Sequence, residues 1–466
     1  MPKAAWIAVL GAVALLAAPA ATVNAAPRMP IGFFDDISFR YSPDADANMA
    51  AAAKAGATVI HTAASWPQIA PTRPTHPLDA DDPAYHLTDL DTLVREASKY
   101  GLRVMVDITG SPKWANGNQT PNHMPKKLSD LTDFAFMLAQ RYDGKNPGKG
   151  VVSMWSIWNE PNLQQFLTPQ YNSKGVIVSP AAYAKLYKAA YTGIKRANPQ
   201  AQVAIGETSA QGRDKPSKGS SETVSPGTFA KLLGRVKGLK FDAWAHHPYP
   251  TSPGAKPLEK VRYPNVTLTQ LPTFEKTLKA AFHKSRVPIW ITEYGHETKP
   301  AERKGVSYST QAAYAKQALN YAKADPDVDM FIWFTFRDNA GNPWQSGLEQ
   351  PSGAHKASYN AFASVARLID GTTQVVKAGR APTVTVYVPY LAYYNQAGGA
   401  FGITYRVYDG KKLIAVGQPT SPMSPDEAIT FKANFSPVKG KTYTVTAVVN
   451  DPNGNAQTRD VTLVAS

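Results

Sequence analysis

Apolar and polar positions repeat in one pattern from residue 30 to about residue 370. Each unit has a short apolar run rich in β-branched or aromatic residues, then a loop, then a stretch whose apolar residues recur with the 3.6-residue period of a helix. This alternation is typical of parallel strands joined by crossover helices. The predicted strands are residues 31–35, 58–62, 103–108, 153–158, 202–206, 241–245, 288–292 and 330–335.

Eight strands is the number that closes a (β/α)₈ TIM barrel, so we predict an α/β barrel domain over residues 27–375. The intervening helices are also visible; residues 130–142, for example, place Leu131, Phe134 and Leu138 on one face. In such a barrel, the loops that follow the strand C-termini build the active site. The unusual polar and aromatic residues of this chain gather after the predicted strands, which predicts a functional site there.

Beyond about Arg380 the pattern changes to short alternating strands without helices, with the turn pairs Asp409-Gly410 and Asn453-Gly454. We therefore expect residues 380–466 to form a small antiparallel β-sandwich in the style of an immunoglobulin domain. Such a domain either binds carbohydrate or stabilises the barrel by packing against it. The second interpretation is favoured because no cluster of aromatic residues distinguishes the segment.

The N-terminus has the pattern of a secretory signal peptide. Lys3 precedes an apolar run over residues 4–21, and small residues offer a cleavage site near Ala26, so we predict a signal peptide over residues 1–26. The mature protein is then secreted, either extracellular or associated with the cell envelope; a retained N-terminal anchor is the alternative. No later stretch approaches ~20 uninterrupted apolar residues, so we do not expect an integral membrane protein.

The composition narrows the range of partners. The chain has no cysteine, so disulfide bonds and thiol chemistry are excluded. Its formal charge of +15 would attract polyanions such as acidic polysaccharides or a charged cell envelope. Dense Lys/Arg runs and nucleic-acid motifs are lacking, so we expect no nucleic-acid partner. The sequence does not specify an oligomeric state.

Two glutamates carry the clearest chemical signal. Glu160 follows the fourth predicted strand and Glu293 follows the seventh, each at the end of an apolar run. Hydrolysis of a glycosidic bond needs one carboxylic acid to protonate the leaving oxygen and a second carboxylate to attack the anomeric carbon or to activate water. An acid at the start of a helix is the ordinary alternative for a single residue, but the pair on one rim predicts a glycosidase.

Further polar residues follow the other strands. His247 and Tyr249, two positions apart after the sixth strand, share one face of an extended segment, and a tyrosine hydroxyl donated to Glu293 would keep that carboxylate ionised. Glu207 and Glu297 are additional acids expected at the rim, where they would bind sugar hydroxyls. Adjacent histidines point to opposite faces of a strand, and no ligand spacing such as HExxH is present, so we predict neither a metal nor a cofactor.

Three tryptophans are candidates for stacking on a sugar ring, with core packing as the alternative for each. They are Trp333 on the eighth strand, Trp66 after the second strand and Trp114 after the third.

The segments Trp158-Asn159-Glu160-Pro161, His247-Pro248-Tyr249 and Thr292-Glu293-Tyr294-Gly295, together with Trp333, resemble the retaining glycoside hydrolases of clan A. The resemblance covers about residues 30 to 370 and extends to family 39-like and family 5-like members. It implies a (β/α)₈ barrel, Glu160 as acid/base, Asn159 bound to the sugar 2-hydroxyl and Glu293 as nucleophile. The implied substrate is a β-linked glycan or glycoside.

One position departs from the clan pattern. An arginine that supports the nucleophile commonly stands five positions before the second-strand tryptophan, and here that position, before Trp66, is His61. His61 would replace the arginine as a neutral or protonated donor, with a changed pH optimum.

The expected reaction is double displacement with retention, in which the two carboxyl groups lie about 5 to 5.5 Å apart. Two alternatives use the same residues, namely a transglycosylase and a diglycosidase that cleaves the bond to an aglycone. A third alternative, of another class, is a catalytically silent carbohydrate-binding protein.

Overall fold

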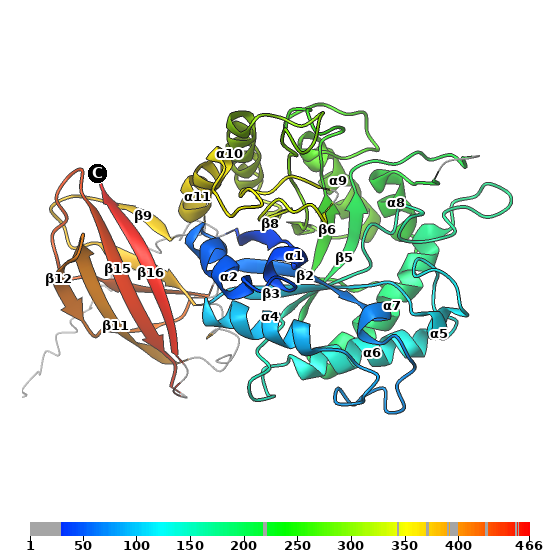
Figure 1. Ribbon diagram of the computed structural model, residues 1–466, viewed down its shortest axis with the longest axis horizontal. Helices are drawn as coiled ribbons and strands as arrows, with labels where there is room; N and C mark the ends of the chain where they lie inside the picture. The colour runs from blue at the N-terminus through cyan, green and yellow to red at the C-terminus, as the bar shows by residue number, and fades with distance from the viewer. Residues whose placement is uncertain are drawn as a thin grey trace, which may run out of the picture.

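The computed structural model describes residues 29–217, 221–342, 344–369, 372–388, 391, 399–424, 427–452, 454 and 456–466. The predicted signal peptide, residues 1–26, lies outside the described residues. Figure 1 shows a large barrel domain with a smaller sheet domain beside it. None of the helices in the described ranges is both long enough and apolar enough to cross a membrane.

The larger domain is the predicted barrel. Eight parallel strands pair in chain order and close because β1 pairs with β8. The strands coincide with the eight predicted runs, with shifts of a few residues at their ends. They are β1 (Ile31–Phe34), β2 (Val59–Ser65), β3 (Arg103–Thr109), β4 (Met154–Ile157), β5 (Gln202–Ser209), β6 (Ala243–His247), β7 (Ile289–Ile291) and β8 (Val328–Trp333).

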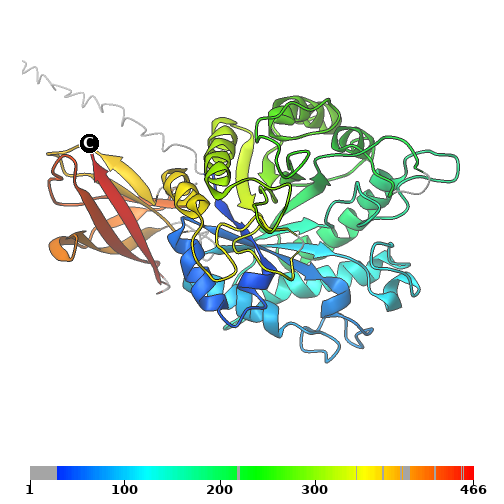
Figure 2. The ribbon, with the colours of Figure 1, turned by 45° about the horizontal axis from the view of Figure 1, so that its top comes forward.

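Helices surround the barrel (Figure 2). The apolar face predicted on one of them is buried as expected, with Leu131, Phe134 and Leu138 at most 1% exposed. They are α1 (Asp36–Phe39), α2 (Ala45–Lys54), α3 (Trp66–Ile69), α4 (Thr88–Lys99), α5 (Lys113–Asn116), α6 (Leu128–Arg141), α7 (Ser179–Ala197), α8 (Pro226–Leu233), the short 3₁₀ helix Leu268–Gln270, α9 (Leu271–Phe282), α10 (Tyr308–Ala324) and α11 (Ala357–Ile369).

Asp35 joins the two ends of the barrel. This buried carboxylate, directly after β1, accepts hydrogen bonds from the backbone N–H groups of Phe336 (3.1 Å) and Arg337 (3.0 Å), which follow β8. It also accepts from the N–H and the hydroxyl of Ser38 at the start of α1. Burial raises the pKa of Asp35, and these donors oppose the rise. One side chain therefore connects the first strand to the loop after the last strand.

The smaller domain contains two sheets. One has the order β12-β11-β15-β16-β9, with β13 paired to β11, and the other pairs β10 with β14. Their strands are β9 (Thr373–Val376), β10 (Thr383–Tyr387), β11 (Ala400–Asp409), β12 (Lys412–Gly417), β13 (Thr420–Pro422), β14 (Ala428–Lys432), β15 (Thr442–Asn450) and β16 (Ala456–Ala465).

The predicted sandwich is confirmed with two corrections. Strand β9 pairs with β16 in parallel, so the larger sheet is mixed rather than purely antiparallel. Strand β9 also begins at Thr373, so this sheet starts inside the range 27–375 that we predicted for the barrel. Pairing between β9 and β16 is a contact between distant parts of the chain, and local alternation carries no information about it.

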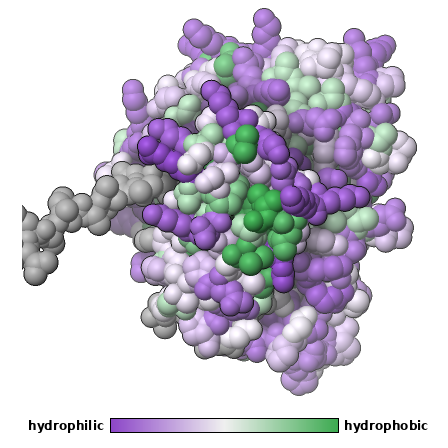
Figure 3. Space-filling model, turned by 90° about the vertical axis from the view of Figure 1, so that its left-hand side faces the viewer, coloured by the Kyte–Doolittle hydropathy of each residue, from purple (hydrophilic) through white to green (hydrophobic). Residues whose placement is uncertain are grey.

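The smaller domain packs at the end of the barrel opposite to the strand C-termini. Arg103, the first residue of β3, lies 3.4 Å from the carboxylate of Glu427 in the smaller domain. Figure 3 shows the outer face of this domain, where apolar side chains gather; Leu413, Ile414 and Val416 on β12 are exposed. Among the described residues of the domain, the large exposed side chains are aliphatic rather than aromatic. The domain thus lies away from the rim that holds the glutamates.

A matched pair of substitutions tests the core of the smaller domain. Val445 on β15 is fully buried and packs in a cluster that includes Val384, Val461 and Leu463, whereas Val438 is 57% exposed. We expect Val445→Ala to lower the free energy of unfolding by about 2 kcal/mol, through lost burial and the cavity left behind. Val438→Ala should change it by less than about 0.5 kcal/mol. Urea titration measures both, and equal effects of the two substitutions would contradict this packing.

Candidate active site

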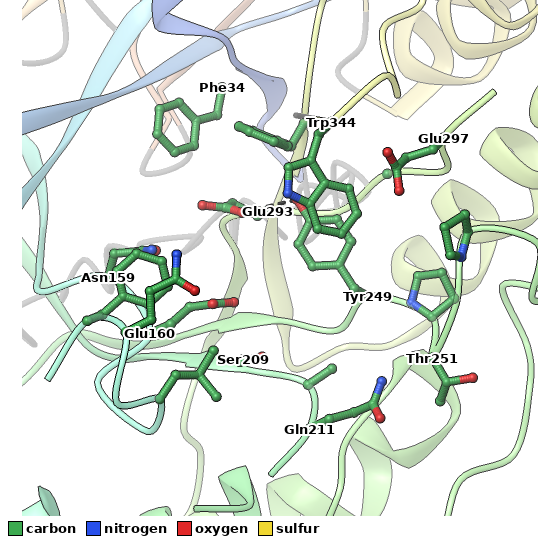
Figure 4. Close-up of a pocket in the computed structure, with 18 of the residues that line it drawn as sticks. Phe34, Asn159, Glu160, Ser209, Gln211, Tyr249, Thr251, Glu293, Glu297 and Trp344 are labelled. Atoms are coloured by element: carbon green, nitrogen blue, oxygen red, sulfur yellow. Dashed lines mark hydrogen bonds between the residues drawn. The ribbon is translucent and has the colours of Figure 1, made fainter. Parts of the chain in front are cut away.

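A cavity of about 610 Å³ opens at the C-terminal ends of the barrel strands. Figure 4 shows the carboxylates of Glu160 and Glu293 directed into it. Loops after several different strands contribute to its wall, as the barrel architecture requires. The predicted residues that line it are Asn159, Glu160, Tyr249, Glu293 and Glu297.

Glu160 follows β4 in a constrained segment. Trp158 and Glu160 both have positive φ angles, 71° and 37°, a region that costs energy for side chains other than glycine. The indole of Trp158 is fully buried and donates a hydrogen bond to the carbonyl oxygen of Phe166 at 2.6 Å, which holds the turn in place. Pro161 then directs the chain away from the strand. The packed indole thus stabilises a strained backbone that presents Glu160 to the cavity.

The imidazole of His247 lies between three carboxylates. Its Nδ1 is 3.0 Å from Glu160 Oε1 and 3.8 Å from Glu293 Oε2, and its Nε2 is 2.8 Å from Glu207 Oε2. Burial alone would lower the pKa of His247, but the charge of Glu293 and the hydrogen bonds to Glu160 and Glu207 raise it well above its usual value. The ring is therefore an imidazolium that donates to both Glu160 and Glu207.

The His247 geometry also limits the separation of the two glutamates. Both Glu160 Oε1 and Glu293 Oε2 approach the same nitrogen, at 3.0 and 3.8 Å, so these oxygens cannot be farther apart than the two distances added together. That limit falls at the lower end of the ~6.5 to 9.5 Å separation of inverting glycosidases, whereas retaining enzymes use about 5 to 5.5 Å. The cavity is therefore built for two closely spaced carboxyl groups.

Glu293 is held by Tyr249, as the sequence suggested. The Tyr249 hydroxyl donates a hydrogen bond to Glu293 Oε2 at 3.0 Å. The pKa of Glu293 is raised to about 7, mainly by burial and in part by the charges of Glu160 and Glu207. The His247 charge and the Tyr249 hydroxyl act in the opposite direction. The Tyr249 hydroxyl and the His247 charge therefore favour the ionised form of Glu293.

Glu207 does not reach the cavity, so the expectation that it contacts sugar at the rim is not supported. Its side chain is buried, and it accepts hydrogen bonds from His247 and from the Thr292 hydroxyl at 2.7 Å. Its φ angle is 45°, and the preceding Gly206 has φ 111°, so β5 is bent at this point. Burial would raise the pKa of Glu207, but the hydrogen bond from His247 holds it below the usual value. Glu207 therefore orients His247.

His61 also lies beneath the cavity rather than in its wall. Its Nδ1 is 3.2 Å from the carbonyl oxygen of Thr292, and its buried Nε2 has no hydrogen-bond partner in the part of the chain that the structure describes. Burial lowers the pKa of His61 to about 4, despite the opposing charge of Glu207. The ring is therefore neutral above that pH and does not supply the positive charge that an arginine would bring to this position.

Asp107 is a cavity residue that sequence reasoning missed. It lies on β3, is 3% exposed, lines the cavity, and accepts a long hydrogen bond of 3.4 Å from Ser156. Burial and the nearby charge of Glu207 raise its pKa well above the usual value. Its signal in the sequence was an acidic residue inside the apolar run over residues 103–108, an unusual place for a carboxyl group.

The three predicted tryptophans do not line the cavity, which corrects their assignment to sugar binding. Trp333 is fully buried, and its indole donates to the Ser346 carbonyl oxygen at 2.9 Å. Trp66 is fully buried against Phe134 and Trp114. The indole of Trp114 donates to the Ala70 carbonyl oxygen.

The indole at the cavity is instead that of Trp344, in the loop after β8. It is 39% exposed and stacks on Tyr249 with ring centroids 5.2 Å apart. Phe34, Phe166 and Phe334 supply further aromatic wall. Within the described ranges, the acids and histidines of the chain nowhere form a cluster of three placed to hold a metal ion.

A barrel whose strand ends bring two carboxylates together in one cavity defines a glycoside hydrolase. The chain belongs to the cellulase family, glycosyl hydrolase family 5, whose family model matches residues 27–338. It is also 21% identical over 324 residues to a β-xylosidase of Caldicellulosiruptor saccharolyticus, covering 65% of this chain and 60% of that protein. The chain spans less than two thirds of the length of the curated relatives that it matches.

Solved structures share the fold. A family 39 glycoside hydrolase from Bacteroides cellulosilyticus WH2 superposes with a TM-score of 0.55 at 17% identity, covering 87% of this chain and 79% of that one. A family 39 enzyme from Xanthomonas axonopodis pv. citri gives a TM-score of 0.52 at 14% identity, covering 91% and 94% of the two chains. The resemblance to clan A glycosidases is therefore confirmed for the fold and the class of enzyme.

Two tryptophan variants separate binding from packing. We expect Trp344→Ala to raise the KM for an aryl β-glycoside about fivefold, because an exposed stacking surface is lost. We expect Trp333→Phe to leave KM near the wild-type value and to lower the free energy of unfolding by about 2 kcal/mol, because a buried carbonyl loses its donor. Steady-state kinetics and urea titration measure the two effects. A raised KM in Trp333→Phe with an unchanged KM in Trp344→Ala would mean that Trp333, rather than Trp344, contacts the substrate.

Proposed function

We propose that the protein is a secreted, retaining β-glycosidase with Glu293 as nucleophile and Glu160 as acid/base. The observation that carries the proposal is the position of His247, which brings Glu160 and Glu293 within 3.0 and 3.8 Å of one nitrogen. Membership of a glycosyl hydrolase family supports the reaction class. Export rests on the signal-peptide pattern of residues 1–26.

In the first step, the Glu293 carboxylate attacks the anomeric carbon and the bond to the leaving oxygen breaks. Glu160 Oε1 is occupied by the His247 donor, so the proton that passes to the leaving oxygen is carried by Oε2. The products of this step are the free aglycone alcohol and a glycosyl ester of Glu293.

In the second step, Glu160 acts as a base. It takes a proton from water, the water oxygen attacks the anomeric carbon from the face that the aglycone left, and the ester bond to Glu293 breaks. The two displacements restore the original anomeric configuration. Loss of the negative charge on Glu293 in the ester intermediate favours the switch of Glu160 from acid to base.

The walls of the cavity suit a β-linked sugar with an apolar leaving group. Asn159 lines the cavity beside Glu160 and is available to a sugar hydroxyl. Leu163 and Phe166, in the loop that follows Glu160, line the side from which the leaving group is protonated. The name of one relative, a β-xylosidase, supports a β-linked sugar as the substrate.

Loss of either carboxylate should have a distinct signature. We expect Glu293→Gln to reduce kcat on aryl β-glycosides at least about 10⁴-fold, because no covalent intermediate forms. We expect Glu160→Ala to retain turnover on a dinitrophenyl glycoside, whose leaving group needs no proton, and to form a β-glycosyl azide when azide is added. NMR of the wild-type reaction should show the β-anomer first.

The control is Glu96→Gln, a substitution of a helical surface acid that pairs with Arg95 and Lys99, which should keep wild-type kinetics. Initial release of the α-anomer would reject retention. Wild-type turnover by Glu293→Gln would remove Glu293 from the nucleophile role.

The hydrogen bond from Tyr249 should appear in the pH dependence. The hydroxyl lowers the pKa of Glu293, which burial raises to about 7. Its removal in Tyr249→Phe therefore raises that pKa, and the acidic limb of kcat/KM should move to higher pH by up to about one unit.

The matched control is Tyr294→Phe, which removes a hydroxyl paired with His296 instead of the nucleophile. Its acidic limb should stay at the wild-type position. If the acidic limb of kcat/KM lies at the same pH in the wild type, Tyr249→Phe and Tyr294→Phe, the Tyr249 hydroxyl does not lower the pKa of Glu293.

A further inference from the structure

The charge of the cavity is opposite to that of the protein. The chain carries a formal charge of +15, yet the charged side chains that line the cavity are all carboxyl groups. They are Asp107, Glu160, Glu293 and Glu297. Within the described residues, no lysine or arginine lines this wall. The basic surface suggested an acidic polymer, but the cavity repels an acidic sugar such as a uronic acid.

Glu297 stands out because the proposed reaction does not use it. It follows β7 four residues after the nucleophile, is 6% exposed and lines the cavity. Its Oε1 accepts a hydrogen bond from the backbone N–H of Gln345 at 3.3 Å. Its Oε2 has no partner among the described residues, and the carboxylate pairs with no cation there. A buried carboxylate without a countercharge is costly, so a cationic ligand group would stabilise it.

An aromatic surface adjoins this carboxylate. Gln345, the donor to Glu297, directly follows Trp344, whose exposed ring stacks on Tyr249. Glu297 is also close enough to raise the pKa of Tyr249, after the effects of burial, Glu293 and Glu160. An ammonium group is attracted both to a carboxylate and to the face of an indole ring. Figure 4 shows Glu160 on one side of the cavity and Glu297 on the other.

We propose that the glycone side of the cavity binds a sugar unit with a free amine, a deacetylated hexosamine, whose ammonium group lies between the Glu297 carboxylate and the Trp344 ring. The proposal rests on the proposed glycosidase function and specifies its substrate class. The free Glu297 Oε2 would accept a hydrogen bond from the ammonium group. An N-acetyl group removes the positive charge, so acetylated units lose this interaction.

Binding to a catalytically blocked protein tests the proposal without turnover. The full-length Glu160→Gln variant is titrated by calorimetry with β-1,4-linked tetramers of glucosamine, N-acetylglucosamine and glucose at low ionic strength. We expect the glucosamine tetramer to bind about tenfold more tightly than either neutral tetramer, as for a charge-assisted hydrogen bond. Raising the salt to 0.5 M should reduce this preference.

Adding Glu297→Gln to the same background should abolish the preference for the glucosamine tetramer. The matched control, Glu302→Gln, changes a nearby acid that does not line the cavity, and it should keep the preference. Thermal unfolding of each variant checks that it is folded. The proposal is overturned if the Glu297 and Glu302 variants show the same preference for the glucosamine tetramer. It is also overturned if the Glu160→Gln protein binds the glucosamine tetramer no more tightly than the glucose tetramer.

The proposed glycosidase function fails on different evidence. If the wild-type protein hydrolyses neutral aryl β-glycosides but the blocked variant binds the glucosamine tetramer no more tightly than the neutral ones, the amine site is rejected and the glycosidase function stands. Amine-selective binding by a protein that hydrolyses no glycoside keeps the site and rejects the glycosidase.

Discussion

The active site depends on one buried positive charge, the imidazolium of His247. Strands β4, β5 and β7 deliver Glu160, Glu207 and Glu293 to one small region, where three carboxylates would repel one another strongly. His247, at the end of β6, lies within 2.8 to 3.8 Å of an oxygen of each. The attraction to this charge makes the crowding possible, while burial, together with the charges of Glu160 and Glu207, holds the pKa of Glu293 near 7.

The same requirement explains where the backbone is strained. Glu160 and Glu207 both adopt positive φ angles, 37° and 45°, at the points where their side chains turn toward His247. Each strained residue is held by a packed neighbour or a hydrogen bond, the Trp158 indole for one and the Thr292 hydroxyl for the other. The surrounding barrel thus offsets local strain that serves the geometry of the site.

The sequence predicted the barrel and the two glutamates because both depend on local pattern. Strands and helices have their own periods, and a carboxyl group at a strand end is visible without tertiary information. The tryptophan assignments failed because residue type does not say which way an indole faces; Trp333 turns into the wall, while Trp344 stacks at the mouth from an irregular loop. The roles of Glu207 and Asp107, and the pairing of β9 with β16, arise from long-range packing that no window of the sequence contains.

The Asp35 hydrogen bonds have a consequence for how the protein folds. Asp35 is separated from Phe336 by 301 positions, so this contact between the two ends of the barrel cannot form until almost the whole barrel domain is available. Contacts between such distant residues slow folding, because a long loop must close before any stabilisation is gained. No cysteine is present to lock an intermediate covalently. Glu160 and Glu293 are therefore brought into one assembled site only late in folding.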